Sequence, residues 1–503
     1  MVNFFKRIIS AKYGMLYVAL AGGIICSLCH LIFSVDLYRD SANVYAFMAR
    51  ALAEGNHADA FHVNIPHLNI CCSYPFTLLG MAPEKALSLV SCLFYLGTIV
   101  YLFFLTREFL PEKLAGFGTI LFAFAPKIIR FFCTALIDSG KCFFLVAALY
   151  YGCKLIKSNF RSWGNAAGFG TALGLLSLAR SEGIANAGVL GLCIGVFSII
   201  EALRNKRFLP VIMMFFVGTL TVIFLASRVV MMGIFCGKWI YDERIADGIA
   251  KIFPQLSTGS KVISSDAIPV KVFNSSWSHL AEQNARGSYE VYLLFTVIGL
   301  IILLLALYWK KSPALFPDKK VPDFIKWNNY YWVFLIVIVS NMLIFKAAKI
   351  LAHRYFLLNI PVLMVFTLIG IYWAWRQISR LIPQQILLLL IIIILPLQAA
   401  NGLSRCFGKK YRTDYNTGLY LKQNLQPGKA IPIEKAAGVW YYSGLERALP
   451  VEAPPVDLAT FNDFKYIICP VKDVNLKIFE NRRDLQEIKI PVKSTVRVFK
   501  KVR

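Results

Sequence analysis

Two aspartates occupy positions where a carboxylate could do chemistry at the edge of a membrane. Asp40 lies in a polar loop after the first long apolar segment, and Asp138 lies where one apolar segment gives way to the next. A positioned carboxylate can accept the proton of an attacking hydroxyl, which is general-base catalysis. An ionisable group at a membrane boundary is a candidate functional group by default. The alternative for each aspartate is a helix N-cap, in which the carboxylate accepts a backbone N–H.

The loop that contains Asp40 has a helical pattern. Tyr45, Met48, Ala49 and Leu52 recur at helical spacing, so an amphipathic helix is predicted to follow Asp40. The same loop contains three histidines and a further aspartate: His57, Asp59, His62 and His67. Spacings of five place no two of these histidines on one helical face, and no compact metal-ligand motif appears. Polar packing or substrate contact is the favoured interpretation, and a divalent metal is left open.

Basic residues gather at the turns that face the same side as the two aspartates. They are Lys127, Arg130, Lys141, Arg180, Lys346, Lys349 and Arg354. Because Lys and Arg normally favour cytoplasmic loops, this placement needs a reason. A phosphate ligand supplies one, since a guanidinium can bond two of its oxygens. The alternative for any single base is snorkelling to the interface, and for Arg180 with Glu182 it is an ion pair of little energetic worth.

The composition requires these residues to be positioned by membrane-spanning helices. Of 503 residues, 57% are hydrophobic and only 16% are charged, against about 25% charged in soluble domains. The mean hydropathy is +0.60. These values exclude a disordered chain, a coiled coil and an ordinary soluble enzyme. The net charge of +26 is spread over the ends of apolar segments, which favours topology signalling and contact with anionic membrane lipids over nucleic-acid binding.

About eleven spans are predicted, from the length of about 20 apolar residues that a bilayer requires. They are 13–33, 86–105, 114–132, 139–156, 164–179, 184–200, 208–228, 290–308, 329–345, 355–374 and 383–400. Their basic loops place the N-terminus in the cytoplasm and the C-terminus outside. The predicted fold class is therefore an α-helical polytopic membrane protein.

The regions outside the membrane are two long loops and a tail. The first loop is predicted at 34–85, the second at 229–289, and a separate domain at 401–503 after a membrane domain at 1–400. Short strand-like runs at 430–433, 466–469, 487–491 and 495–499, with a helix-like stretch at 414–425, predict a small α/β domain. Internal repeats are not evident, which argues mildly against an inverted-repeat transporter.

Several motifs together resemble those of membrane glycosyltransferases of the GT-C superfamily. The first-loop run contains Arg39-Asp40-Ser41, Tyr45, Ala49-Arg50, Gly55 and Pro66-His67-Leu68. Asp138 follows as the second acidic residue, then Arg180-Ser181-Glu182-Gly183, and then His353-Arg354-Tyr355 with Pro361. The resemblance covers about residues 10–400. It is closest to the bacterial branch that is related to protein O-mannosyltransferases and to the aminoarabinose transferase of lipid A, like glycosyltransferase family 39.

The resemblance implies a reaction and a set of site residues. A sugar carried on a polyprenyl phosphate passes, outside the membrane, to a hydroxyl of a lipid, glycan or protein acceptor. Asp40 and Asp138 correspond to the family's catalytic acidic residues, with Asp40 as general base. The implied substrate-binding residues are Arg39, Tyr45, His67, Lys127, Arg130, Arg180, Glu182, Lys346, His353, Arg354 and Tyr355. The implied location is a bacterial inner membrane.

This sequence departs from the family at two points. Many relatives have two adjacent acidic residues in the first loop, whereas Ser41 follows Asp40 here and the nearest other acid is Asp36. An acidic metal-binding pair is therefore not carried over. The segment Asn64-Ile65-Pro66-His67-Leu68 replaces a Lys-Pro-Pro-Leu type segment of the aminoarabinose transferases, so their acceptor is not carried over either. The alternatives are a transporter or flippase of a lipid-linked sugar, a polysaccharide polymerase or ligase, and a non-catalytic scaffold.

Overall fold

The computed structural model describes most of the chain. The described residues are 13–35, 37–38, 40–242, 282, 290–309, 328–347, 353–379, 382–407, 409–433, 436–448, 464–471, 476–490, 494 and 496–502. Arg39 and Lys349 lie outside them, as does most of the predicted second loop. For Lys346, His353 and Tyr355 only the backbone is described.

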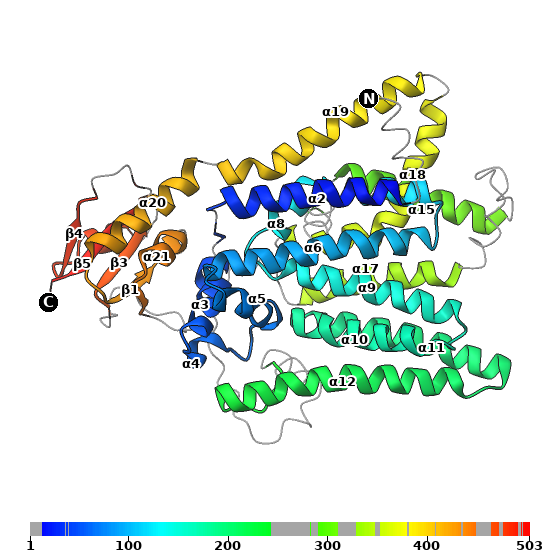
Figure 1. The fold of residues 1–503 in the computed structure, drawn as a ribbon, viewed down its shortest axis with the longest axis horizontal. Coiled ribbons are helices and arrows are strands. Elements are labelled where there is room, and N and C mark those ends of the chain that lie inside the picture. Colours follow the sequence, from blue (N-terminus) through cyan, green and yellow to red (C-terminus); the bar gives the residue numbers. More distant parts are fainter. Residues whose placement is uncertain are drawn as a thin grey trace.

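Long apolar helices run side by side and make up most of the molecule (Figure 1). They are α2 (Gly14–Phe33), α6 (Pro83–Arg107), α7 (Glu112–Ala123), α8 (Pro126–Phe132), α9 (Asp138–Lys157), α10 (Trp163–Ala179), α11 (Gly183–Asn205), α12 (Leu209–Cys236), α15 (Glu290–Trp309), α17 (Asn328–Ala347), α18 (Asn359–Ile378) and α19 (Gln384–Leu403). Each of the segments that the sequence predicted to span a membrane is helical. The predicted fold class is thus confirmed.

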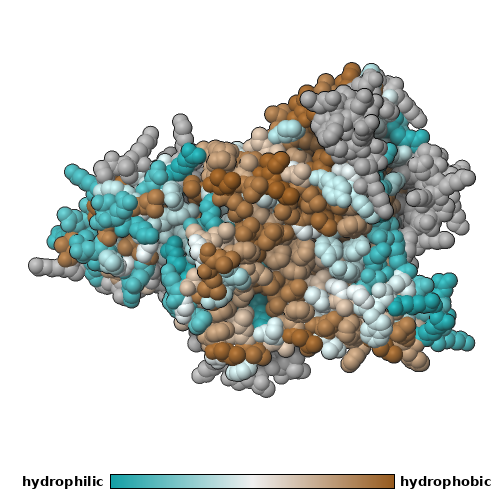
Figure 2. All heavy atoms as spheres, in the orientation of Figure 1, coloured by the Kyte–Doolittle hydropathy of each residue, from teal (hydrophilic) through white to brown (hydrophobic). Residues whose placement is uncertain are grey.

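The molecule is a multi-pass membrane protein. Among the described residues, six helices are long and apolar enough to cross a bilayer, or seven if α7 and α8 form one bent span. The count of about eleven spans therefore stays a prediction. Figure 2 shows an apolar band across the helices, with hydrophilic surface at both ends of the bundle. That distribution matches a bilayer flanked by two aqueous phases.

The third predicted span, 114–132, is not one continuous helix. α7 and α8 are separate and are bent by 60° at a short break. The cause is Pro126, the first residue of α8, because proline lacks an N–H and disfavours helical geometry in the residue before it. Because of this bend, α8 is not collinear with α7. α8 carries Lys127 and Arg130 at one end of the bundle.

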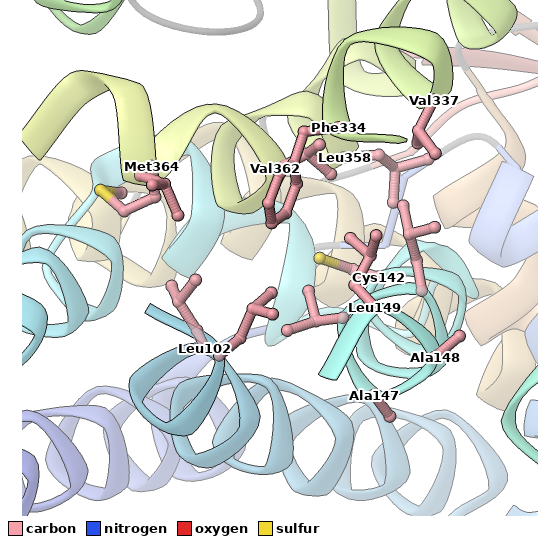
Figure 3. Close-up of a cluster of buried hydrophobic side chains, with 14 of the residues drawn as sticks. Leu102, Cys142, Ala147, Ala148, Leu149, Phe334, Val337, Leu358, Val362 and Met364 are labelled. Carbon is pink, nitrogen blue, oxygen red and sulfur yellow. The ribbon is translucent and has the colours of Figure 1, made fainter. Parts of the chain in front are cut away.

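The interior of the bundle is a continuous apolar core. Figure 3 shows side chains from different helices converging in it, among them Leu102 of α6, Leu149 of α9, Phe334 of α17 and Val362 of α18. All four are buried. Among the candidate spans, α9 and α18 have the largest share of buried residues, whereas few residues of α12 are buried. Helices that are apolar all round are stable in this setting because lipid or other helices surround them.

Short elements cover the end of the bundle at which α9 begins. The first loop folds into a π-helix η1 (Ser41–Tyr45), then α3 (Ala46–Ala53), α4 (His57–Ala60) and α5 (Leu68–Leu78). The helix predicted after Asp40 is confirmed, with Met48, Ala49 and Leu52 buried. A 3₁₀ helix, η4 (His353–Leu358), packs against both α8 and α9.

The tail forms a small α/β domain next to the first-loop helices (Figure 1). After η5 (Ser404–Phe407) come α20 (Lys409–Asn424), β1 (Lys429–Pro432), α21 (Ala437–Ser443), β2 (Glu446–Arg447), β3 (Tyr466–Pro470), α22 (Leu476–Glu480), β4 (Leu485–Ile488) and β5 (Val496–Lys501). The strand order is β2-β1-β3-β5-β4. β1 is parallel to β2 and β3, and β5 is antiparallel to β3 and β4. The four predicted strands correspond to β1, β3, β4 and β5.

Candidate active site

Asp40 forms an ion pair and does not cap a helix. It immediately precedes η1, and its side chain makes no capping hydrogen bond. Its carboxylate accepts a hydrogen bond from Nη2 of Arg354, on η4. The Asp40 side chain is 39% exposed, so the carboxylate combines a fixed partner with access from solvent. The N-cap interpretation of Asp40 is therefore wrong.

A π-helix directly follows this aspartate. η1 has a wider backbone than an α-helix, and single turns of this kind occur often at functional sites. Tyr45, at its end, is half-buried and packs against the core and the first-loop helices. Arg39, predicted to bind substrate, lies outside the described residues.

The helix α8, which carries two cationic residues, packs against η4, the element that holds Arg354. Lys127 and Arg130 are three residues apart, so they lie on one side of α8. Arg130 donates from Nη2 to the Asn401 carbonyl at 3.4 Å, which ties α8 to the end of α19. On the same helix, the Phe131 ring stacks on Tyr38 of the first loop with centroids 5.2 Å apart.

Asp138 belongs to a second, buried group of charges. It is the first residue of α9, after the N-cap residue Ile137, and is ion-paired with Nη1 of Arg180. Arg180 also binds Glu182, with Nε 3.1 Å from Oε2. Lys141, one turn further along α9, is fully buried. These two acids and two bases sum to zero formal charge, which is the arrangement that makes buried charges tolerable.

The electrostatics of Glu182 reflect this pairing. Burial by itself raises the pKa of Glu182, but the charges of Arg180 and Lys141 outweigh it and lower the pKa to about 2. Glu182 is therefore ionised at any physiological pH. The weak interfacial ion pair considered from the sequence is present, but it belongs to a buried network with Asp138.

The turn before Asp138 is fixed by neighbours that sequence reasoning missed. The Leu136 carbonyl accepts from Ser91 Oγ of α6 at 2.6 Å and from Asn69 Nδ2 of α5 at 3.3 Å. The first loop therefore touches the turn that begins α9. The sequence does not indicate which carbonyl the Ser91 and Asn69 side chains bind, because that depends on how the helices pack.

His67 is buried inside the first loop. Its Nε2 accepts the backbone N–H of His62 at 2.9 Å, and its ring lies 5.1 Å from that of Phe61. Burial first, then the charges of Arg228 and His62, lower the pKa of His67 well below its ordinary value. The imidazole is thus neutral and packed into the loop, at 2% exposure.

Arg228 of α12 is another residue that the sequence analysis did not single out. It donates to the Val63 carbonyl at 2.8 Å, lies 3.8 Å from Asp242 Oδ2 and lies over the Tyr241 ring at 4.4 Å. It joins the end of α12 to the first loop. An arginine inside an otherwise apolar run was the available signal.

The described side chains do not assemble a metal site. No group of three His, Cys, Asp or Glu among them could hold an ion. The carboxylate of Asp40 is engaged by a cation, and its neighbour Ser41 supplies a hydroxyl where a second acid would stand. Asp36, the nearest other acid of the first loop, lies outside the described residues, so the possible divalent metal stays a prediction.

Comparison with solved structures decides the fold. The Archaeoglobus fulgidus oligosaccharyltransferase, in a crystal structure with Zn and sulfate, is similar over 91% of this chain and 68% of its own, with a TM-score of 0.58 and 12% sequence identity. The chain has the GT-C fold. The same archaeal enzyme, in complex with an inhibitory peptide and a dolichol-phosphate, matches 91% of this chain and 70% of its own, with a TM-score of 0.51 and 12% identity.

A bacterial structure is similar to this chain over nearly its whole length. ArnT from Cupriavidus metallidurans, bound to undecaprenyl phosphate, aligns with 97% of this chain and 98% of its own, at 13% identity and a TM-score of 0.49. No protein-family model and no curated protein sequence matches the chain. The GT-C fold expected from the first-loop, Arg-x-Glu-Gly and His-Arg-Tyr motifs is confirmed.

Proposed function

We propose that the protein transfers a sugar from a polyprenyl-phosphate donor to an acceptor hydroxyl at the extracytoplasmic face of the membrane. The observation that carries the proposal is the accessible Asp40 carboxylate, held by Arg354 next to cationic α8 at one end of a GT-C bundle. A carboxylate base and a cationic phosphate site are the two things that this reaction needs.

The proposed reaction is a direct displacement at the anomeric carbon of the sugar. Asp40 accepts the proton of the acceptor hydroxyl while the oxygen attacks the anomeric carbon. The bond from that carbon to the phosphate oxygen breaks, and the polyprenyl phosphate leaves with the electron pair. Attack from the side opposite the phosphate inverts the anomeric centre. Asp40 ends the step protonated and then releases the proton to solvent.

Arg354, Lys127 and Arg130 are proposed to stabilise the phosphate. A guanidinium has five N–H donors, so Arg354 is able to hold Asp40 and a phosphate oxygen together. Charge develops on the leaving phosphate as the bond breaks, and cations fixed in advance stabilise it most. Lys346, His353 and Tyr355, on α17 and η4, stay proposed substrate contacts, as do Arg39 and Tyr45. His67 is proposed to pack the first loop instead, because its ring is buried and its Nε2 accepts from His62.

Asp138, Arg180 and Glu182 are proposed to support the site and not to touch the reacting atoms. Asp138 is only 3% exposed and is paired with Arg180, so a substrate would have to displace that pair to reach it. The group orders the start of α9, against which η4 packs. The sequence predicted a catalytic role for Asp138. We propose instead that Asp138 positions the site without contacting the substrate.

A reconstituted transfer assay tests the proposal. The protein in nanodiscs receives radiolabelled sugar on undecaprenyl phosphate, and a bacterial membrane extract supplies lipid, glycan and protein acceptors. Label that moves to an acceptor supports a transferase. If no label moves with several sugars while labelled lipid crosses the bilayer of liposomes, the protein is a flippase and the proposal is wrong.

The proposed topology puts Asp40 and the C-terminal domain outside and the N-terminus in the cytoplasm. The short basic connections at the opposite end, such as Lys154 with Lys157 and Arg204 with Arg207, support this orientation. The proposed location is a bacterial inner membrane.

A further inference from the structure

The C-terminal domain docks on the segment that carries Asp40. Its helix α21 meets η1 and α3, and Ala42 and Ala46 are fully buried in the apolar cluster that contains Trp440. The Trp440 ring lies 5.7 Å from that of Phe47. The two small side chains let the helices approach closely, so α21 packs against the helix that follows Asp40.

Tyr441, the next residue of α21, makes polar contacts with both the first loop and the bundle. Its hydroxyl donates to Glu84 Oε2, in the first turn of α6, at 2.7 Å. The Arg50 guanidinium of α3 lies over its ring at 3.9 Å and donates from Nη2 to its carbonyl at 3.2 Å. One residue of the tail thus fastens the loop helix α3 to the spanning helix α6.

A second contact holds the chain on the other side of Asp40. The Tyr442 hydroxyl donates to the Val35 carbonyl at 3.2 Å. Val35 precedes Asp40, whereas Ala42 and Arg50 follow it. α21 therefore holds the polypeptide both before and after the proposed base.

We propose that Tyr441 is a positioning residue for Asp40, and that the C-terminal domain is a fixed part of the active site through α21. The inference rests on the proposed function, because it assigns Tyr441 a role in the step that Asp40 performs. Burial, and then the charge of Glu84, raise the pKa of Tyr441 well above its ordinary value. The phenol therefore stays protonated and keeps donating to Glu84 at every working pH.

The test removes a single oxygen atom. Tyr441→Phe deletes the hydrogen bond to Glu84 and keeps the ring under Arg50. The matched control is Tyr466→Phe, which deletes the hydrogen bond from a tyrosine of the same domain to the Gln426 carbonyl, at 3.2 Å, and removes no hydrogen bond to the first loop. Both variants are purified in nanodiscs, and their thermal stability is compared with that of the wild type.

Kinetics give the first readout. We expect Tyr441→Phe to lower kcat about tenfold with KM for the donor unchanged, because misplacing a base weakens the chemical step and not ground-state binding. Tyr466→Phe should retain the wild-type kcat. In a Glu84→Leu background, which has no side-chain acceptor, Tyr441→Phe should have little additional effect, since both changes break one contact. Wild-type kcat in Tyr441→Phe, or an equal loss in Tyr466→Phe, would overturn the proposal.

Hydrogen exchange gives a readout that needs no substrate. Amides of residues 41–53 should exchange about tenfold faster in Tyr441→Phe than in wild type, and those in Tyr466→Phe should be unchanged. If the wild-type protein transfers no sugar, the proposed function fails while exchange still decides whether Tyr441 holds this segment. Unchanged exchange at 41–53 in Tyr441→Phe overturns the inference whatever the activity.

Discussion

Asp40 and Asp138 are both paired with arginine, but their surroundings give them different roles. The Asp40 side chain is 39% exposed and that of Asp138 is 3% exposed. Asp40 is able to meet a substrate, whereas Asp138 holds two helices together. Sequence position alone made the two look equivalent, because each stands at the start of a helix.

Stability should separate these two aspartates. Asp138→Asn leaves the buried Arg180 with one anionic partner fewer, so we expect a loss of about 3 kcal/mol in the free energy of unfolding. Asp40→Asn, at a more exposed pair, should cost less than about 1 kcal/mol. Thermal unfolding in one detergent measures both. Equal melting temperatures for the two variants would contradict this assignment of roles.

The pairing of Glu182 predicts how the stability of the protein depends on pH. Its pKa is about 2 in the folded protein and about 4.5 in the unfolded chain, so its pairing stabilises fully above pH 4.5 and is lost as pH falls toward 2. The stability advantage of wild type over Glu182→Gln should shrink by up to about 1.4 kcal/mol per pH unit below pH 4.5. Melting curves at pH 7, 4 and 3 test this. An advantage that stays constant down to pH 3 would exclude the pairing.

At the scale of elements, the sequence predicted the apolar helices and four of the strands because periodicity and hydropathy are local properties. It did not predict the break at Pro126 or the existence of α21 and β2. It also could not reveal that Arg354 meets Asp40, because 314 positions separate them and only the packing of η4 brings them together. Motif order placed both residues in the site, but not as partners.

Close packing of α15 on α18 gives an element-scale prediction. A Cβ on Gly370 would lie 2.0 Å from the backbone oxygen of Phe295, so Gly370→Ala forces the two helices apart. We expect it to destabilise the protein by about 2 kcal/mol. Gly218→Ala on α12, where a Cβ meets nothing within 4 Å, is the matched control and should be neutral or slightly stabilising. Equal melting temperatures for the two variants would rule out tight contact between α15 and α18.

At the scale of the whole molecule, the tail domain and the first loop share one end of the bundle. Cys72 in the first loop is exposed, as is Val502 near the C-terminus. In intact cells, a membrane-impermeant maleimide should label Cys72 and a Val502→Cys variant. It should not label Lys206→Cys in a Cys72→Ser background, because the α11–α12 turn lies at the opposite end. If Lys206→Cys is labelled and Val502→Cys is not, the orientation in the membrane is the reverse of the proposed one.

The central claim is that Asp40 is the base of a sugar transfer from a lipid phosphate, and one comparison tests it most directly. Transfer of labelled sugar from undecaprenyl phosphate is measured for wild type, Asp40→Asn and Asp59→Asn in nanodiscs. Asp59 is a half-buried aspartate of the same loop, which accepts a hydrogen bond from Asn56 at 2.8 Å, and serves as the matched control. We expect Asp59→Asn to retain activity and Asp40→Asn to lose at least about 100-fold in kcat with its fold intact. Transfer by Asp40→Asn at the wild-type rate would contradict the account.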